Sequence, residues 1–175
     1  MPGTGTGSGG QPAAAAACAG ACPAATALLG LDGLRVLAVT PDDDGWTVVD
    51  VATDLAAGAG ARPGCGVTAS RCKEQVVTSP GDAYLGDAQI QLRWHKARWF
   101  CDNQDCPRRS FTEATAAVGR RCRMTTRMRC RMGACAGDEL MPVSAVAGRY
   151  RVCERTVARA FASYAGTELA TLSEH

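Results

Sequence analysis

The chain has 175 residues and a formal net charge of +2, which leaves room for one ordinary domain or two small ones. The charge is −5 over residues 1–92, +8 over residues 93–131 and −1 over residues 132–175, so the middle block is either a candidate surface for a polyanion or a solvated basic face. No run of about 20 apolar residues exists, which excludes a transmembrane helix and makes a cytoplasmic protein the expectation.

The first expected segment is a disordered leader over residues 1–30. It consists almost entirely of Gly, Ala, Pro, Ser and Thr and has no charged residue. It lacks the basic start and the continuous run of larger apolar residues that a secretory signal needs. Without such a signal, the ten cysteines of the chain indicate metal ligation or buried thiols more than a disulfide framework.

A β-rich segment is expected over residues 31–114. Apolar runs at residues 34–39 and 46–51 flank a cluster of turn-forming residues, which is typical of a β-hairpin. Residues 71–78 are a third strand candidate. The longest candidate is residues 88–101, in which apolar and polar side chains alternate with period two. We expect these strands to form a small antiparallel module.

A cysteine pattern within this segment indicates a metal site. Cys101 and Cys106 are separated by four residues at the end of the long strand candidate, and a turning chain can bring both thiolates to one side of a tetrahedral ion. Cys65, about 35 residues earlier, belongs to a second such turn, but Arg62 stands where its partner cysteine would be. The fourth ligand is therefore open. Cys72 is one candidate, and the alternative is that it is a small buried hydrophobic residue. His95 is the other candidate, and the alternative is that it is an exposed strand residue in a basic patch.

The pattern beyond the β-rich segment is helical, and residues 115–165 are expected to form a helical region. Met124, Met128 and Met132 recur at steps of four with arginines around them, which predicts a buried stripe rather than a binding surface. The tail, residues 166–175, is expected to fray.

The last predicted helices fit a helix-turn-helix motif. Ala147 is the small residue where the helices cross, Arg151 lies in the turn, and Val157 anchors the second helix. Gly is usual in that turn, so Arg151 must adopt a less comfortable backbone conformation. Arg155 and Arg159 would share the exposed face of the second helix, within reach of phosphates or guanine edges. The alternative is a plain helical hairpin that packs on the β module.

Residues 63–71, 92–101 and 106–113 together resemble the N-terminal zinc ribbon of insertion-sequence transposases of the ISL-three class. The most specific part is residues 98–113, which contain the order aromatic-Cys, four residues, Cys-Pro-Arg, two residues, Phe-Thr-Glu. The resemblance covers roughly residues 31–165. It implies a ribbon and a following helix-turn-helix region that recognise the ends of the element, while a downstream domain of RNase H type cuts and joins DNA with divalent metal.

The chain departs from this family pattern at several positions. Arg62 stands where the family has its first zinc cysteine, and Cys122 and Cys130 fall in a stretch that is arginine-rich in the family. Zinc is therefore the expected cofactor, at a site that is incomplete at Arg62. Such changes fit sequence drift in a decaying gene copy, which is a hypothesis that high-affinity binding of one zinc per chain would contradict.

The combined expectation is an α+β protein, in which a small zinc-ribbon-like antiparallel β module precedes a helical helix-turn-helix region. The expected function is that of a DNA-binding N-terminal fragment of a transposase, which recognises element ends without the catalytic domain and is not itself an enzyme. The alternative is a stand-alone DNA-binding regulator or interaction module with a degenerate zinc ribbon. The expected partner is DNA at the ends of the element, and no membrane partner is expected.

The candidate residues fall into two sets. The candidate metal ligands are Cys65, Cys101, Cys106 and Cys72. The candidate nucleic-acid contacts are basic residues of the middle block and of the last helix, namely Arg93, Lys96, Arg98, Arg108, Arg109, Arg123, Arg127, Arg155 and Arg159.

Overall fold

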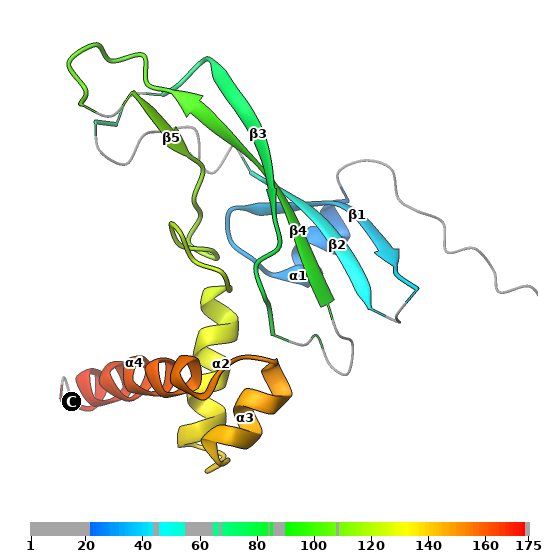
Figure 1. Ribbon diagram of the computed structural model, residues 1–175, viewed down its shortest axis with the longest axis vertical. Coiled ribbons are helices and arrows are strands. Elements are labelled where there is room, and N and C mark those ends of the chain that lie inside the picture. Colours follow the sequence, from blue (N-terminus) through cyan, green and yellow to red (C-terminus); the bar gives the residue numbers. More distant parts are fainter. Residues whose placement is uncertain are drawn as a thin grey trace, which may run out of the picture.

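A computed structural model of the chain describes residues 22–43, 46–54, 65–66, 68–83, 85, 90–107 and 109–173, with only the backbone described for residues 171–173. Within this part the chain has a mixed α/β fold with a five-stranded sheet and four helices. The strands are β1 (Leu34–Pro41), β2 (Thr47–Thr53), β3 (Cys72–Thr78), β4 (Ile90–Phe100) and β5 (Ser110–Thr112). The helices are α1 (Pro23–Leu29), α2 (Thr126–Gly137), α3 (Val143–Tyr150) and α4 (Glu154–Ser173). In Figure 1, α2, α3 and α4 gather beyond one end of the sheet.

The sheet confirms the predicted hairpin and corrects one strand pairing. β1 and β2 pair antiparallel, from Leu34 opposite Thr53 to Pro41 opposite Thr47. β4 is the central strand, and it pairs antiparallel with β3 and, over its last residues, with β5. The first half of β4 pairs parallel with β2, so the expectation of a wholly antiparallel module is wrong at this pair.

The parallel pairing joins two buried apolar faces. In the register of β2 and β4, Val49 lies beside Leu92, and Val51 lies beside Trp94. All four side chains are buried in one cluster, which we call the sheet core. Alternation with period two specifies the buried face of each strand, but it does not specify which strand completes that face.

Helix α1 corrects the predicted extent of the leader. Pro23 suits the first helical turn, where its missing N–H costs no hydrogen bond, and Gly30 ends the helix in the left-handed conformation with φ 61°. Leu29 and Leu31 are buried in the sheet core, so apolar burial orders this segment. Residues 1–21, the remainder of the predicted leader, lie outside the described residues.

The helices α2, α3 and α4 enclose a second cluster, which we call the helical core, and it confirms the methionine stripe. Met128 and Met132 of α2 are buried there, and Met124 packs against the cluster from the loop before the helix. The side chain of Thr125 accepts a hydrogen bond from the Met128 N–H at 3.0 Å and so caps the start of α2. The stripe therefore belongs to the helical core and its edge.

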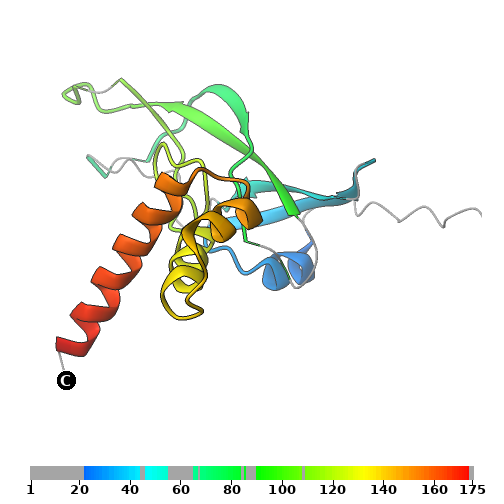
Figure 2. The ribbon, with the colours of Figure 1, turned by 60° about the horizontal axis from the view of Figure 1, so that its bottom comes forward.

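Helix α4 is longer than the sequence predicts. It runs to Ser173, so residues 166–173, which were expected to fray, continue as helix. This stretch contains the good helix formers Glu168, Leu169 and Ala170. Figure 2 shows α4 extending away from the sheet. None of the described helices is long and apolar enough to cross a membrane.

Candidate functional site

Three cysteines that are distant in the sequence lie together at one end of the sheet. The sulfur atoms of Cys65, Cys101 and Cys106 all lie within 4.8 Å of one another, and those of Cys65 and Cys101 are 3.8 Å apart. Cys101 directly follows β4, while Cys106 is buried in the turn between β4 and β5. The Cys106 N–H donates to the Asn103 carbonyl at 3.3 Å, which closes this turn. The prediction that these three thiols converge is confirmed, and we call them the three-cysteine group.

Asp102 ties the two turns of the three-cysteine group together. Its carboxylate accepts hydrogen bonds from the Ser70 N–H and hydroxyl at 3.0 Å each and from Arg71 Nε at 3.5 Å. The backbone hydrogen bond from Ser70 is the main reason that the pKa of Asp102 lies below its usual value, and the hydroxyl and Arg71 add to it. The segment that follows Cys65 is thereby fastened to the residue after Cys101.

The proposed fourth ligand, Cys72, is not part of the group. It begins β3 on the strand register opposite Trp99, and its exposed thiol donates to the Glu74 carbonyl at 3.5 Å. Arg62 lies outside the described residues. The described residues thus supply three thiolates, which zinc prefers, whereas a structural zinc site is closed by four protein ligands.

This geometry predicts that zinc removal leaves the fold largely intact. The sheet core contains none of the three cysteines, so its apolar burial persists without metal. We expect a chelator to lower the free energy of unfolding by less than about 1 kcal/mol, which corresponds to about 2–4 °C in melting temperature for a chain of this size. Thermal unfolding with and without chelator, on samples of measured zinc content, checks this.

A matched pair of variants identifies the ligands. Cys101→Ser should lower whatever zinc content the unchanged chain has, whereas Cys72→Ser, a change of the same kind on the neighbouring strand, should leave it unchanged. A large cooperative unfolding on chelation, or a loss of zinc in Cys72→Ser, would contradict this account of the site.

The basic residues of β4 have partners within the chain. Arg93 pairs with Asp50 at 2.6 Å, and Arg98 pairs with Glu74 at 3.0 Å. The ammonium group of Lys96 lies 4.4 Å from the centre of the Trp94 ring. Burial lowers the pKa of Lys96, and the Glu113 carboxylate opposes that effect. These side chains are therefore partly neutralised or covered by the sheet itself.

The Asp50 carboxylate on β2 holds two partners from β4. Besides Arg93, it contacts His95 through Nε2 at 2.6 Å. Burial by itself would raise the pKa of Asp50, but the hydrogen bonds from Arg93 and His95 outweigh it and hold the pKa below the usual value. His95 thus belongs to a strand-crossing pair and lies outside the three-cysteine group.

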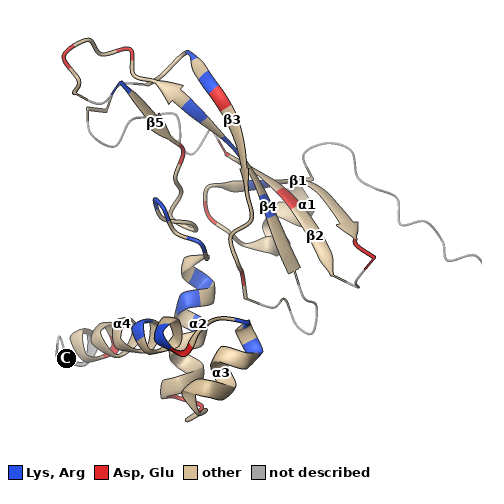
Figure 3. Cartoon of the chain, viewed as in Figure 1, with Lys and Arg blue, Asp and Glu red and all other residues tan. Residues whose placement is uncertain are grey.

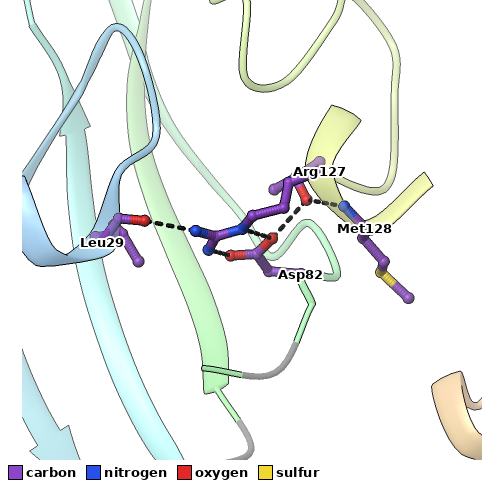
Figure 4. A network of polar contacts seen from close by, with 5 residues as sticks. Leu29, Asp82, Arg127 and Met128 are labelled. Atoms are coloured by element: carbon purple, nitrogen blue, oxygen red, sulfur yellow. Dashed lines mark hydrogen bonds and ion pairs between the residues drawn. The ribbon is translucent and has the colours of Figure 1, made fainter. Parts of the chain in front are cut away.

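Arg127 has a structural role that the sequence did not reveal. Its guanidinium forms an ion pair with Asp82, through Nη2 and through Nε at 3.2 Å, and Nη1 donates to the Leu29 carbonyl at 2.6 Å (Figure 4). The Asp82 side chain is fully buried and also accepts the Thr125 hydroxyl at 2.5 Å. Arg127 therefore joins α2 to the end of α1, and we remove it from the candidate DNA contacts.

The remaining candidates lie on the surface. Arg109, Arg123, Arg155 and Arg159 are exposed, and none of them forms an ion pair with another described residue. In Figure 3, basic residues are seen in the loop before α2, in the first turns of α2 and on α4 near its crossing with α2. Arg108 lies outside the described residues. A cationic face therefore includes the loop before α2 and the first half of α4.

The connection between α3 and α4 has the expected backbone. Arg151 follows α3 in the left-handed conformation with φ 53°. This is the conformation that Gly usually supplies in such a turn, and Arg151 adopts it as expected. Its guanidinium lies 5.0 Å from the centre of the Trp46 ring, so the turn contacts the residue before β2. Ala147 of α3 and Val157 of α4 are both buried in the helical core.

No match was found when the chain was compared with protein-family models, curated proteins and solved structures.

A groove between α2 and α4 adds residues that were not among the candidates. It has a volume of about 400 Å³ and is lined by Met124, Arg129, Thr156, Arg159, Ala160 and Ser163. Arg159 was predicted from its place on the last helix. Arg129 belongs to the arginines between residues 120 and 131, which are expected to contact phosphates, and Thr156 lies on the expected exposed face of the last helix. Ser163 was missed, because its proximity to Arg129 depends on the crossing of two helices and leaves no local signal in the sequence.

Proposed function

We propose that the chain binds double-stranded DNA through the cationic face formed by the loop before α2 and the first half of α4. The observation that carries the proposal is the exposure of Arg123, Arg155 and Arg159 without an ion pair to any described carboxylate. Arginines that lack a carboxylate partner are available to displace counterions from a phosphate backbone. Arg127, by contrast, is occupied by Asp82 and would contribute little.

In this proposal α4 is the recognition helix. Arg155 and Arg159 are four residues apart and therefore lie on one face of α4. The buried Val157 points the opposite face into the helical core, which leaves the arginine face toward solvent. A helix presented in this way can enter the major groove, with its arginines on phosphates or on guanine edges.

We further propose which DNA the chain recognises. The likeness of residues 31–165 to the ISL-three class of transposases favours the ends of an insertion element as the DNA that is recognised. The three-cysteine group would stabilise the turns at the end of the sheet, at some distance from the DNA-contacting helices. The chain would supply recognition, and no catalytic step is assigned to it.

Binding of the purified chain to labelled duplex DNA across salt concentrations tests the proposal. The logarithm of the binding constant should fall linearly with the logarithm of the salt concentration, with a slope of about −0.9 for each phosphate contact. Arg155→Gln should reduce the slope by about 0.9 if Arg155 contacts a phosphate, or cost about 1–3 kcal/mol at one base pair if it reads guanine. Selection from a random DNA pool distinguishes these two cases.

The matched control is Arg35→Gln. Arg35 is exposed on β1, away from the proposed face, and its replacement removes the same charge. Affinity and salt slope should remain close to those of the unchanged chain. A flat salt dependence of the unchanged chain would exclude phosphate-driven binding.

A further inference from the structure

We infer that the groove between α2 and α4 is a seat for one phosphate group, which in the DNA complex is a backbone phosphodiester. That the phosphate comes from DNA rests on the proposed function, whereas the binding of a phosphate group is argued from the groove itself. The groove has a volume of about 400 Å³ and brings together guanidinium and hydroxyl groups from two helices.

The close contact of the two helices fixes the shape of the groove. At Gly133 an added Cβ would lie 2.4 Å from the Tyr164 Cβ and 3.0 Å from the Ala160 carbonyl, so only glycine permits this approach. Arg129 lies one turn before Gly133 on α2 and faces the same crossing. Backbone packing, rather than flexible side chains, therefore sets the distance between the two walls of the groove.

The described lining residues offer guanidinium and hydroxyl groups that can donate hydrogen bonds to a phosphate. Arg129 projects from α2, while Arg159 and the hydroxyls of Thr156 and Ser163 project from α4. None of the lining residues that the structure describes carries a carboxylate. Guanidinium groups bind phosphate oxygens in a bidentate manner, and Ser and Thr hydroxyls commonly add hydrogen bonds to them. Among the described lining residues, Met124 and Ala160 are apolar, which gives an apolar ligand little surface to contact.

The two arginines are not committed to carboxylates. Arg129 donates from Nη2 to the Cys122 sulfur at 3.6 Å, which uses one of its five N–H donors and helps to orient the group. Arg159 is exposed and has no ion pair with any described residue. Arg123 and Arg155 are exposed and directly precede residues that line the groove, so they extend its positive charge along the surface, which suits a chain of phosphates.

The DNA arm of the test compares Arg129→Gln and Arg159→Gln with Arg131→Gln. One phosphate contributes about 0.9 to the salt slope, so each groove variant should remove part of this contribution and the double variant should remove about all of it. Each variant should also weaken binding severalfold on any DNA sequence. Arg131 lies on the same helix as Arg129 but pairs with Glu139 at 2.7 Å outside the groove, so its loss should leave the slope unchanged. Ser163→Asp, at an exposed position, should weaken binding more than either neutral variant because it places a negative charge in the seat.

The phosphate arm uses inorganic phosphate without DNA. Phosphate should shift the NMR signals of Arg129, Thr156 and Arg159 saturably, whereas chloride at equal ionic strength should not. Unchanged slopes in both groove variants, with DNA binding intact, would overturn the inference and leave the proposed function standing. Failure of the unchanged chain to bind DNA would overturn the proposed function. The phosphate titration by itself would then show whether the groove binds phosphate.

Discussion

Replacing Asp82 with alanine should lower the free energy of unfolding by about 3 kcal/mol, the low end of the cost of breaking a buried ion pair. The Asp82 side chain is fully buried, whereas Arg127 is 31% exposed, and water can therefore rescue part of the lost interaction. The change also leaves the Thr125 hydroxyl, which caps α2, without its acceptor. Chemical denaturation followed by circular dichroism measures the effect.

Two further variants separate the charge from the hydrogen bonds. Asp82→Asn keeps an acceptor for Thr125 and loses the charge, so its cost should fall between those of alanine and the unchanged chain. Asp32→Ala removes an exposed carboxylate from the loop after α1 and should change stability by less than about 0.5 kcal/mol. If Asp82→Ala were as stable as Asp32→Ala, the buried pair would not hold α2 against α1.

The ion pair between Asp82 and Arg127 also allows a test of whether Arg127 is a structural residue or a DNA contact. Arg127→Gln should destabilise the chain, because Asp82 is then left as a buried charge without its cation. At a temperature where the variant remains folded, its DNA salt slope should match that of the unchanged chain. A slope reduced by about 0.9 would return Arg127 to the DNA-contacting residues.

Glu113→Ala is the second change with a large expected effect, again about 3 kcal/mol, because three hydrogen-bond donors lose one buried acceptor. The carboxylate accepts the Thr53 hydroxyl at 2.6 Å, the Ala97 N–H at 2.9 Å and the Trp99 Nε1–H at 2.7 Å. The indole of Trp94 donates in turn to the Thr53 hydroxyl at 3.0 Å. Glu113 therefore joins β2, β4 and the chain after β5.

The matched control for this change is Glu154→Ala. Glu154 is exposed at the start of α4, and its removal should have a small effect. Glu113→Gln keeps the shape and one acceptor, so it should be less destabilising than alanine. Tryptophan fluorescence should report local loosening around Trp99 in Glu113→Ala alone. Equal stability of the Glu113→Ala and Glu154→Ala variants would contradict the role of this network.

Local patterns in the sequence predicted the local features of the fold. Turn residues between apolar runs predicted the β1–β2 hairpin, and the step of four in Met124, Met128 and Met132 predicted the buried stripe. The spacing of Cys101 and Cys106 predicted the turn that brings their sulfurs together, and Cys65 joins them as expected. The hairpin and the stripe each depend on residues within one element or one turn. The three cysteines could be predicted together because a metal ion needs several thiolates close to one point.

Tertiary structure alone decided the partners of these elements. The parallel pairing of β2 with β4 places Val49 beside Leu92, although periodicity marks only the buried face of each strand. Leu29 is ordered by that same sheet core, so composition misplaced the end of the leader. The sequence determined that the middle block is basic. Only the fold determined that Asp82, 45 residues away along the chain, neutralises Arg127, and that Arg129 and Arg159 line one groove. The reason is that the sequence gives the charge of each residue, whereas the neighbours in space decide whether that charge is neutralised.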